Sequence, residues 1–222
     1  MVKINIVGVG PGSPDYVTPL ARKTVQQADL VIGAQRTLNL FACEIKGETV
    51  VLTAKNLKTS LKLATESAKK NKNVALLSTG DPGFSGLLHT VLESGLFEAT
   101  DINVVPGVSS IQVCAAKAAL SWDNALLITF HEGNVSDEEK QVLDLAVSSG
   151  EDVILLPDSK AFIPKDIANY LIGGGVDKET SVVVCENLTL PDEKVTASTL
   201  EEVSKQTFGS LCVMVIKSKK ES

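Results

Sequence analysis

The chain has 222 residues, a formal net charge of −6 and a hydrophobic content of 44%. The length suits one large domain or two small ones, and the hydrophobic content suits a well-buried core. The acidic balance argues against nucleic acid as the main partner, and no apolar run is long enough to span a bilayer. Since the first residues lead directly into a strand, without a signal-peptide pattern, we expect a cytoplasmic protein.

Apolar runs and amphipathic segments alternate through the first half of the chain. The predicted strands span 4–9, 30–32, 49–52, 73–78 and 102–105, and the predicted helices span 17–28, 34–41, 57–70, 84–93 and 109–119. This strict alternation predicts a mostly parallel sheet with helices on both faces. We assign residues 1–118 to this first domain.

Residues 119–222 form the second predicted domain. Its predicted strands span 125–130, 153–156, 181–185, 194–197 and 211–217, and its predicted helices span 136–149, 162–171 and 200–205. Ser136 and Glu139 form a capping-box pattern at the start of the first of these helices. A short connection between the strands 181–185 and 194–197 predicts a hairpin, so we expect a mixed α/β sheet in this domain. The predicted fold class is therefore a two-domain α/β protein.

Three predicted strands of the first domain run directly into clusters of glycine, proline and serine, at 8–14, 79–83 and 106–110. Ligands bind at the carboxyl ends of the strands in open parallel sheets, so these loops predict a ligand site, although three plain turns would show the same composition. The first loop does not match the dinucleotide fingerprint, because its third glycine, Gly12, comes too early. Pro11 also lacks the backbone N–H that a phosphate would need.

Side chains in these loops offer polar chemistry. Asp81 lies between a glycine and a proline, where its carboxylate is either a common turn residue or an acceptor for a ligand amine or hydroxyl. Ser109 and Ser110 begin a predicted helix, where they either cap its N-terminus or contact a ligand.

The cysteines and histidines do not predict a metal site or disulfides. The four cysteines, at positions 43, 114, 185 and 212, contain no Cys-x-x-Cys pair, and the chain has only two histidines.

Five segments together resemble the tetrapyrrole methylases, S-adenosylmethionine-dependent enzymes of the cobalamin and sirohaem pathways that have diphthine synthase as a relative. The segments are Gly8-Val9-Gly10-Pro11-Gly12-Ser13, Ser78-Thr79-Gly80-Asp81-Pro82-Gly83-Phe84, Val105-Pro106-Gly107-Val108-Ser109-Ser110, Leu155-Leu156 and Cys185-Glu186-Asn187-Leu188-Thr189. Their order and spacing make the resemblance specific, and they extend over nearly the whole chain.

Within the family, the chain is most similar to the branch that methylates C5 of a cobalt-precorrin. The indicators are Gly33-Ala34-Gln35-Arg36-Thr37-Leu38, Ala115-Ala116-Lys117-Ala118-Ala119-Leu120-Ser121-Trp122, Phe130-His131-Glu132-Gly133 and Glu186-Asn187-Leu188-Thr189-Leu190-Pro191-Asp192-Glu193. One departure concerns the segment after His131, where the family pattern has His-Gly-Arg and this chain has Glu132-Gly133-Asn134. A role of an arginine at that position therefore does not carry over to this chain.

The resemblance implies that S-adenosylmethionine binds folded between the two domains and leaves as S-adenosylhomocysteine. Carried over position by position, it implies seven cofactor-binding residues, namely Pro11, Asp81, Phe84, Ser109, Ser110, Leu156 and Asn187. It implies no metal. On this basis we expect Asp81→Ala to weaken cofactor binding strongly while leaving the melting temperature nearly unchanged.

The implied substrate is a corrinoid ring with many carboxylates, for which Arg36 and Arg22 are the candidate binding residues, since arginine binds carboxylates in a bidentate manner. Arg22 is also a plausible solvated charge, and His131 is either a catalytic base or a structural histidine. The resemblance further implies a homodimer and a separate C15-methylating, decarboxylating partner. The alternatives are another activity of the family, such as diphthine synthase, or a non-catalytic cofactor-binding regulator.

Overall fold

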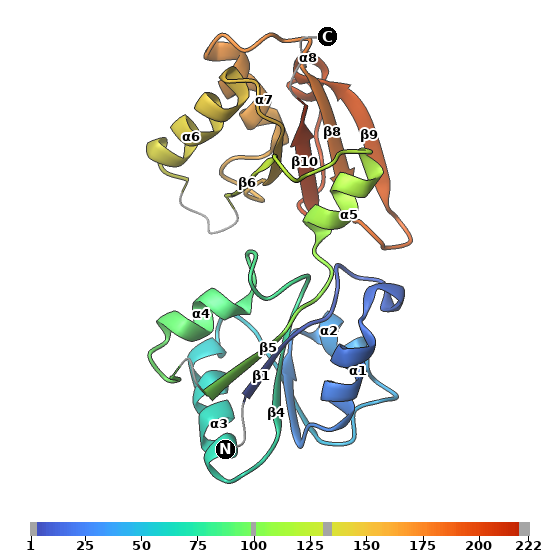
Figure 1. Cartoon of the computed structure of the whole chain (residues 1–222), viewed down its shortest axis with the longest axis vertical. Helices are drawn as coiled ribbons and strands as arrows, with labels where there is room; N and C mark the ends of the chain where they lie inside the picture. The colour runs from blue at the N-terminus through green and yellow to red at the C-terminus, as the bar shows by residue number, and fades with distance from the viewer. Residues whose placement is uncertain (1–3, 99–100, 131–134, 218–222) are drawn as a thin grey trace. The chain divides into compact units, whose positions relative to one another are not determined.

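A computed structural model describes residues 4–98, 101–130 and 135–217. The chain divides between Ser109 and Ser110 into two compact units, each built on its own five-stranded sheet (Figure 1). The two-sheet α/β fold class predicted from the sequence is confirmed.

The first unit contains a fully parallel sheet in the order β3-β2-β4-β1-β5. Its strands are β1 (Ile4–Gly8), β2 (Leu30–Gly33), β3 (Glu48–Val51), β4 (Val74–Ser78) and β5 (Ile102–Val105). The central strands β1 and β4 are almost entirely buried, which explains their continuous apolar sequences. The prediction of a parallel sheet is confirmed.

Helices cover both faces of this sheet, also as predicted. The helical segments are η1 (Pro14–Tyr16), α1 (Pro19–Gln26), α2 (Gln35–Asn39), α3 (Leu57–Lys69) and α4 (Leu87–Glu93). Alternate residues of each strand point to opposite faces, so β1 contributes Val7 to the core with α1 and α2, and Ile6 to the core with α3 and α4.

The second unit contains a mixed sheet in the order β6-β7-β10-β8-β9. Its strands are β6 (Leu126–Thr129), β7 (Val153–Leu156), β8 (Ser181–Glu186), β9 (Lys194–Thr199) and β10 (Cys212–Ile216). The strands β6 and β7 are parallel, whereas β8 pairs with β9 and β10 in antiparallel fashion. The predicted hairpin and mixed sheet are therefore confirmed.

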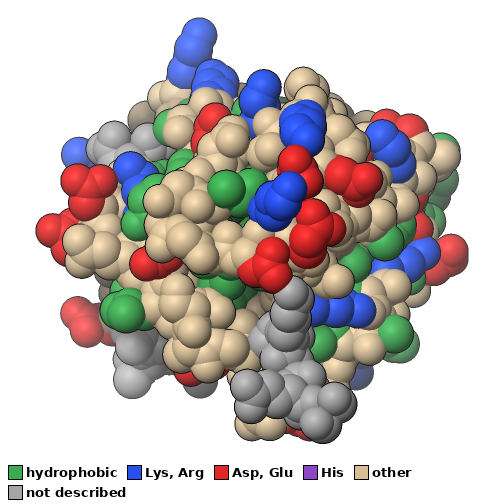
Figure 2. Space-filling model, turned by 90° about the horizontal axis from the view of Figure 1, so that it is seen from above, with side chains coloured by type: hydrophobic (Ala, Val, Ile, Leu, Met, Phe, Trp, Pro, Cys, Tyr) green, Lys and Arg blue, Asp and Glu red, His purple; other side chains and the backbone are tan. Residues whose placement is uncertain are grey.

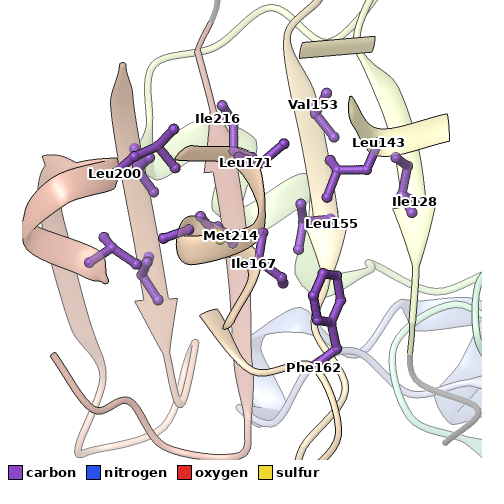
Figure 3. Packing of buried hydrophobic residues seen from close by; sticks show 14 of the residues in the cluster. Ile128, Leu143, Val153, Leu155, Phe162, Ile167, Leu171, Leu200, Met214 and Ile216 are labelled. Atoms are coloured by element: carbon purple, nitrogen blue, oxygen red, sulfur yellow. The ribbon is translucent and has the colours of Figure 1, made fainter. Parts of the chain in front are cut away.

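The core of the second unit lies between one face of its sheet and three helices, α6 (Asp137–Ser148), α7 (Pro164–Gly173) and α8 (Leu200–Val203). Figure 3 shows Leu171 and Ile167 from α7 directed toward Met214 and Leu155 on the strands. On the other face, α5 (Ser110–Lys117) packs against β10 and β7. The capping box predicted at the start of α6 is present, with Ser136 accepting a hydrogen bond from a backbone N–H.

Most helices begin one to three residues later than predicted, and α4 and α7 show the physical reason. The helix α4 begins at Leu87 instead of position 84, because Ser85 has a positive φ of 50° and Gly86 packs against the backbone of Pro82. The helix α7 begins at Pro164, which suits the first helical turn. Phe162 instead enters the core before the helix and packs edge-on against Phe130.

The surface is mixed in charge. On the face shown in Figure 2, Asp and Glu side chains are interspersed with Lys and Arg. Within the described part of the chain, no helix combines the length and apolar character needed to cross a membrane.

Candidate functional site

The three glycine-containing loops meet at one edge of the first sheet. They follow β4, β1 and β5, which are adjacent and parallel, so their carboxyl ends lie at the same edge (Figure 1). The chain passes from β1 to β2 on one side and later from β4 to β5 on the other, which makes this edge a topological switch point. Ligands of open parallel sheets bind at such a point.

Backbone contacts join these loops into one surface. Gly10 and Gly80 exchange two backbone hydrogen bonds, of 3.3 and 2.8 Å, although they lie on different loops. A Cβ atom at Gly107 would lie 2.4 Å from the carbonyl oxygen of Gly80, and one at Gly8 would lie 2.6 Å from the nitrogen of Gly107. The glycines therefore permit a close approach of three backbones that any side chain would prevent.

The Asp81 carboxylate joins two of the loops. One oxygen accepts a hydrogen bond from the Gly83 N–H at 2.8 Å, and the other accepts one from the Gly107 N–H at 3.0 Å. Hydrogen bonds to a charged acceptor are stronger than those between neutral groups. Asp81 thus has a structural task at this edge beside any cofactor contact, and its loss is expected to affect stability as well as binding.

The other predicted cofactor residues of the first unit lie in or near the same loops. Pro11 follows Gly10, the residue that pairs with Gly80. Phe84 is half-buried in the turn before α4, and Ser109 is buried after β5. Ser110, the first residue of α5, belongs to the second unit. Their predicted roles as cofactor contacts remain predictions.

The two arginines of the chain have different surroundings. Arg22 forms an ion pair with Glu44 and donates a second hydrogen bond, of 2.8 Å, to the Pro14 carbonyl. Arg36 is exposed at the start of α2 and donates a 3.1 Å hydrogen bond to the Thr79 hydroxyl. Among the described residues, no carboxylate forms an ion pair with Arg36. Of the two predicted substrate-binding residues, Arg36 therefore keeps an uncompensated charge at the loop edge.

In the second unit, Leu156 and Asn187 lie at one edge of the sheet. Leu156 ends β7 and Asn187 follows β8. Both strands run antiparallel to β10 between them, so they are parallel to each other, and their carboxyl ends lie about 10 Å apart. The strand pairing of the second sheet therefore places these two predicted residues at the same edge.

The turn after β8 is held by a polar network. Asn187 has a positive φ of 48°, and its side-chain amide donates to Asp192 at 2.8 Å. Glu193 accepts a 2.7 Å hydrogen bond from the Thr189 backbone and pairs with Lys117 on α5. The hydrogen bonds from Lys117 and from the Thr189 N–H lower the pKa of Glu193 below its usual value. Residues with such backbone strain persist where the surrounding contacts hold them.

The predicted catalytic residue His131, with the neighbouring Asn134 that departs from the family pattern, lies outside the described residues. The four cysteines are free thiols. Burial raises the pKa of Cys212 to about 12. Within residues 4–98, 101–130 and 135–217, no three potential metal ligands gather at one place.

Sequence reasoning did not single out Thr79, Glu193 or Lys117. Thr79 lies inside the motif quoted for the resemblance, but its contact with Arg36 joins residues 43 positions apart. The contact between Lys117 and Glu193 spans 76 positions. Local sequence patterns do not predict contacts between residues so far apart in the chain. In the fold, the adjacency of strands β2 and β4 brings Arg36 and Thr79 together.

Comparison with known proteins identifies related chains. The family model described as tetrapyrrole (corrin/porphyrin) methylases matches residues 3–204. A probable cobalt-precorrin-7 C(5)-methyltransferase of Methanocaldococcus jannaschii is 41% identical over 219 residues, which cover 98% of this chain and 99% of the relative.

Two solved structures show the same fold. Cobalt precorrin-4 methyltransferase, CbiF, matches with a TM-score of 0.81 and 26% identity, over 97% of this chain and 95% of that one. Uroporphyrin-III C-methyl transferase of Thermus thermophilus, complexed with S-adenosylhomocysteine, matches with a TM-score of 0.76 and 22% identity, over 97% of both chains.

Proposed function

Because this chain belongs to the tetrapyrrole methylase family, we propose that it transfers a methyl group from S-adenosylmethionine to C5 of a cobalt-precorrin, converting cobalt-precorrin-7 to cobalt-precorrin-8 in cobalamin biosynthesis. The observation that carries this proposal is the 41% identity with the M. jannaschii relative over nearly the full length of both chains.

The loop edge of the first unit suits S-adenosylmethionine. This cofactor has no phosphate, and Pro11 gives the first loop one N–H fewer than a phosphate-binding loop would offer. The backbones of Gly10 and Gly80 are paired at a switch point and carry no side chains there, so an adenosyl group is able to approach the main chain.

S-adenosylmethionine supplies an activated methyl group on a positively charged sulfonium, so the reaction requires no metal and no protein nucleophile. The task of the chain is to bind the cofactor and the substrate, to align the methyl group with the carbon that receives it, and to exclude water. We assign Pro11, Asp81, Phe84 and Ser109 of the first unit to cofactor binding. The remaining cofactor positions are Ser110, Leu156 and Asn187 of the second unit.

Arg36 is the leading candidate for substrate binding, because its charge has no ion-pair partner among the described residues. Arg22 is the weaker candidate, since Glu44 already neutralises it. His131 is proposed as a general base or ring contact on the family pattern alone. We further propose a cytoplasmic homodimer that acts together with a separate C15-methylating and decarboxylating enzyme, as the resemblance to the family implies.

Methyl transfer to cobalt-precorrin-7 tests the proposal. The protein is incubated with S-adenosylmethionine and the corrinoid, and the product is analysed by mass spectrometry and by NMR with a labelled methyl donor. One added methyl group at C5 is the expected result. Saturable S-adenosylhomocysteine binding without methylation of any corrinoid would instead favour a non-catalytic cofactor-binding regulator.

A second candidate is a different methylation within the same family. The structural match to cobalt precorrin-4 methyltransferase has the higher TM-score of the two reported above, 0.81. Methylation of cobalt-precorrin-4, with cobalt-precorrin-7 left unmodified, would establish that alternative. Diphthine synthase activity would appear as methylation of a protein substrate.

A further inference from the structure

The Arg36 side chain is anchored at both of its ends. At its base, the next two residues, Thr37 and Leu38, are buried, with exposed fractions of 2% and 6%. The Thr37 hydroxyl donates to the Ala34 carbonyl at 2.8 Å, which fixes the first turn of α2. At its tip, one guanidinium nitrogen donates to the Thr79 hydroxyl at 3.1 Å.

The helix α2 itself sits tightly on the sheet. A Cβ atom at Gly33, the last residue of β2, would lie 2.7 Å from the Thr37 hydroxyl and 2.8 Å from the Leu77 side chain. Only a glycine permits this close approach, so the backbone that carries Arg36 has little freedom to shift relative to β2 and β4. The position of the guanidinium then depends on the side-chain torsions, which the Thr79 contact restricts.

A guanidinium has five N–H donors in a fixed fork, and the contact with Thr79 uses one nitrogen of it. Because Arg36 is exposed and has no ion-pair partner among the described residues, the rest of the fork remains able to bind a carboxylate with two parallel hydrogen bonds. The neutral hydroxyl of Thr79 orients the fork without compensating its charge. A carboxylate in place of the Thr79 hydroxyl would neutralise the guanidinium, as Glu44 does for Arg22, and a substrate carboxylate would then bind less well.

Thr79 also links this arginine to the loop edge. It directly precedes Gly80, which pairs with Gly10, and Asp81, which binds the Gly107 N–H. The guanidinium and the three glycine loops therefore belong to one rigid edge of the first unit.

We propose that Thr79 is a positioning residue that holds the Arg36 guanidinium as a receptor for one carboxylate of the ring substrate. This inference rests on the proposed function, since it names how that substrate is held. It predicts that the hydroxyl of Thr79 acts on substrate binding through Arg36 and leaves cofactor binding unchanged. A preorganised donor loses less conformational freedom on binding, so the effect appears in substrate affinity.

The test measures binding of cobyrinic acid, a corrinoid with free carboxylates, by calorimetry with the S-adenosylhomocysteine-loaded protein. Thr79→Val is expected to weaken binding about tenfold, because it removes a hydrogen bond that orients a charged donor. Thr79→Ser, which restores the hydroxyl, should recover most of the affinity, and Arg36→Gln should weaken binding at least as much as Thr79→Val. The matched control is Thr59→Val, an exposed threonine on α3 whose hydroxyl donates to the Asn56 carbonyl.

Two further measurements decide between positioning and a merely structural role. The methyl ester of cobyrinic acid, which lacks the charges, should bind wild type and Thr79→Val equally. In the methylation assay, Thr79→Val should raise KM and leave kcat nearly unchanged. The inference is overturned if Thr79→Val binds cobyrinic acid as tightly as wild type does. It is also overturned if Thr79→Val weakens the binding of the acid and of the ester equally, or if Thr79→Ser does not restore the affinity for the acid. Failure of the wild type to bind S-adenosylhomocysteine would refute the proposed function and not this inference. In that case, the comparison of acid and ester binding on the cofactor-free protein still tests the roles of Arg36 and Thr79.

Discussion

Replacing Asp81 with alanine should destabilise the first unit as well as weaken cofactor binding. The side chain accepts hydrogen bonds from the Gly83 and Gly107 N–H groups, at 2.8 and 3.0 Å. Gly83 is exposed, so water replaces the lost acceptor there at little cost. Gly107 is half-buried, and leaving its N–H without a charged acceptor costs about 2 kcal/mol.

For a chain of this size, that loss corresponds to a melting temperature lowered by about 4–8 °C. Because the same contacts shape the loop edge, the dissociation constant of S-adenosylhomocysteine should rise by about tenfold or more. Asp81→Asn keeps one acceptor oxygen, which is able to serve Gly107, so it should lie between wild type and Asp81→Ala in both measurements. Scanning calorimetry and titration calorimetry provide the two values.

The control is Asp123→Ala, which removes an exposed aspartate that accepts a 3.1 Å hydrogen bond from Ser121. It should change stability by less than about 0.5 kcal/mol. A melting temperature of Asp81→Ala equal to wild type would refute the structural role of the carboxylate. A lowered melting temperature with unchanged cofactor affinity would refute the placement of the cofactor at these loops.

Three other variants test separate parts of the structure. Gly107→Ala places a Cβ atom 2.4 Å from the Gly80 carbonyl oxygen, so it should separate the loops and abolish S-adenosylhomocysteine binding in calorimetry; retained affinity would contradict the packing. Leu171→Ala should lower the free energy of unfolding by about 2–5 kcal/mol in urea titrations, because this side chain is fully buried in the second core. The pKa of Glu193 is lowered in the folded protein, so its contribution is complete above about pH 4.5 and is lost as the pH falls through the folded pKa. Glu193→Gln should therefore be less stable than wild type at pH 7, and a difference that persists unchanged at pH 3 would contradict this account.

Much of the fold follows from local patterns. The continuous apolar run of β1 and the glycine that ends it identify a buried strand, and the strict alternation of strands and helices in the first unit favours parallel pairing. Parallel pairing in turn brings the ends of the strands to one edge, so the meeting of the three loops followed from the sequence as well.

The details of the site depend on contacts between distant residues, which no local pattern reports. The sequence contains two arginines, and only the fold shows that Glu44 neutralises Arg22 while Arg36 has no ion-pair partner among the described residues. In the same way, the sequence identifies Asp81 as either a turn residue or a ligand acceptor, and only the fold shows its contact with Gly107, 26 positions away. The expectation that Asp81→Ala leaves the melting temperature nearly unchanged is therefore replaced by the one given above.

The central position of β1 has a consequence for folding. This strand is the first in the chain, yet both of its partners come late, since β4 begins at Val74 and β5 at Ile102. During synthesis the apolar β1 therefore emerges without a partner for the time needed to make some 70 further residues. Pairings of such high contact order form slowly. The loop edge includes Gly107, which follows β5, so a chain synthesised only as far as β4 lacks part of this edge.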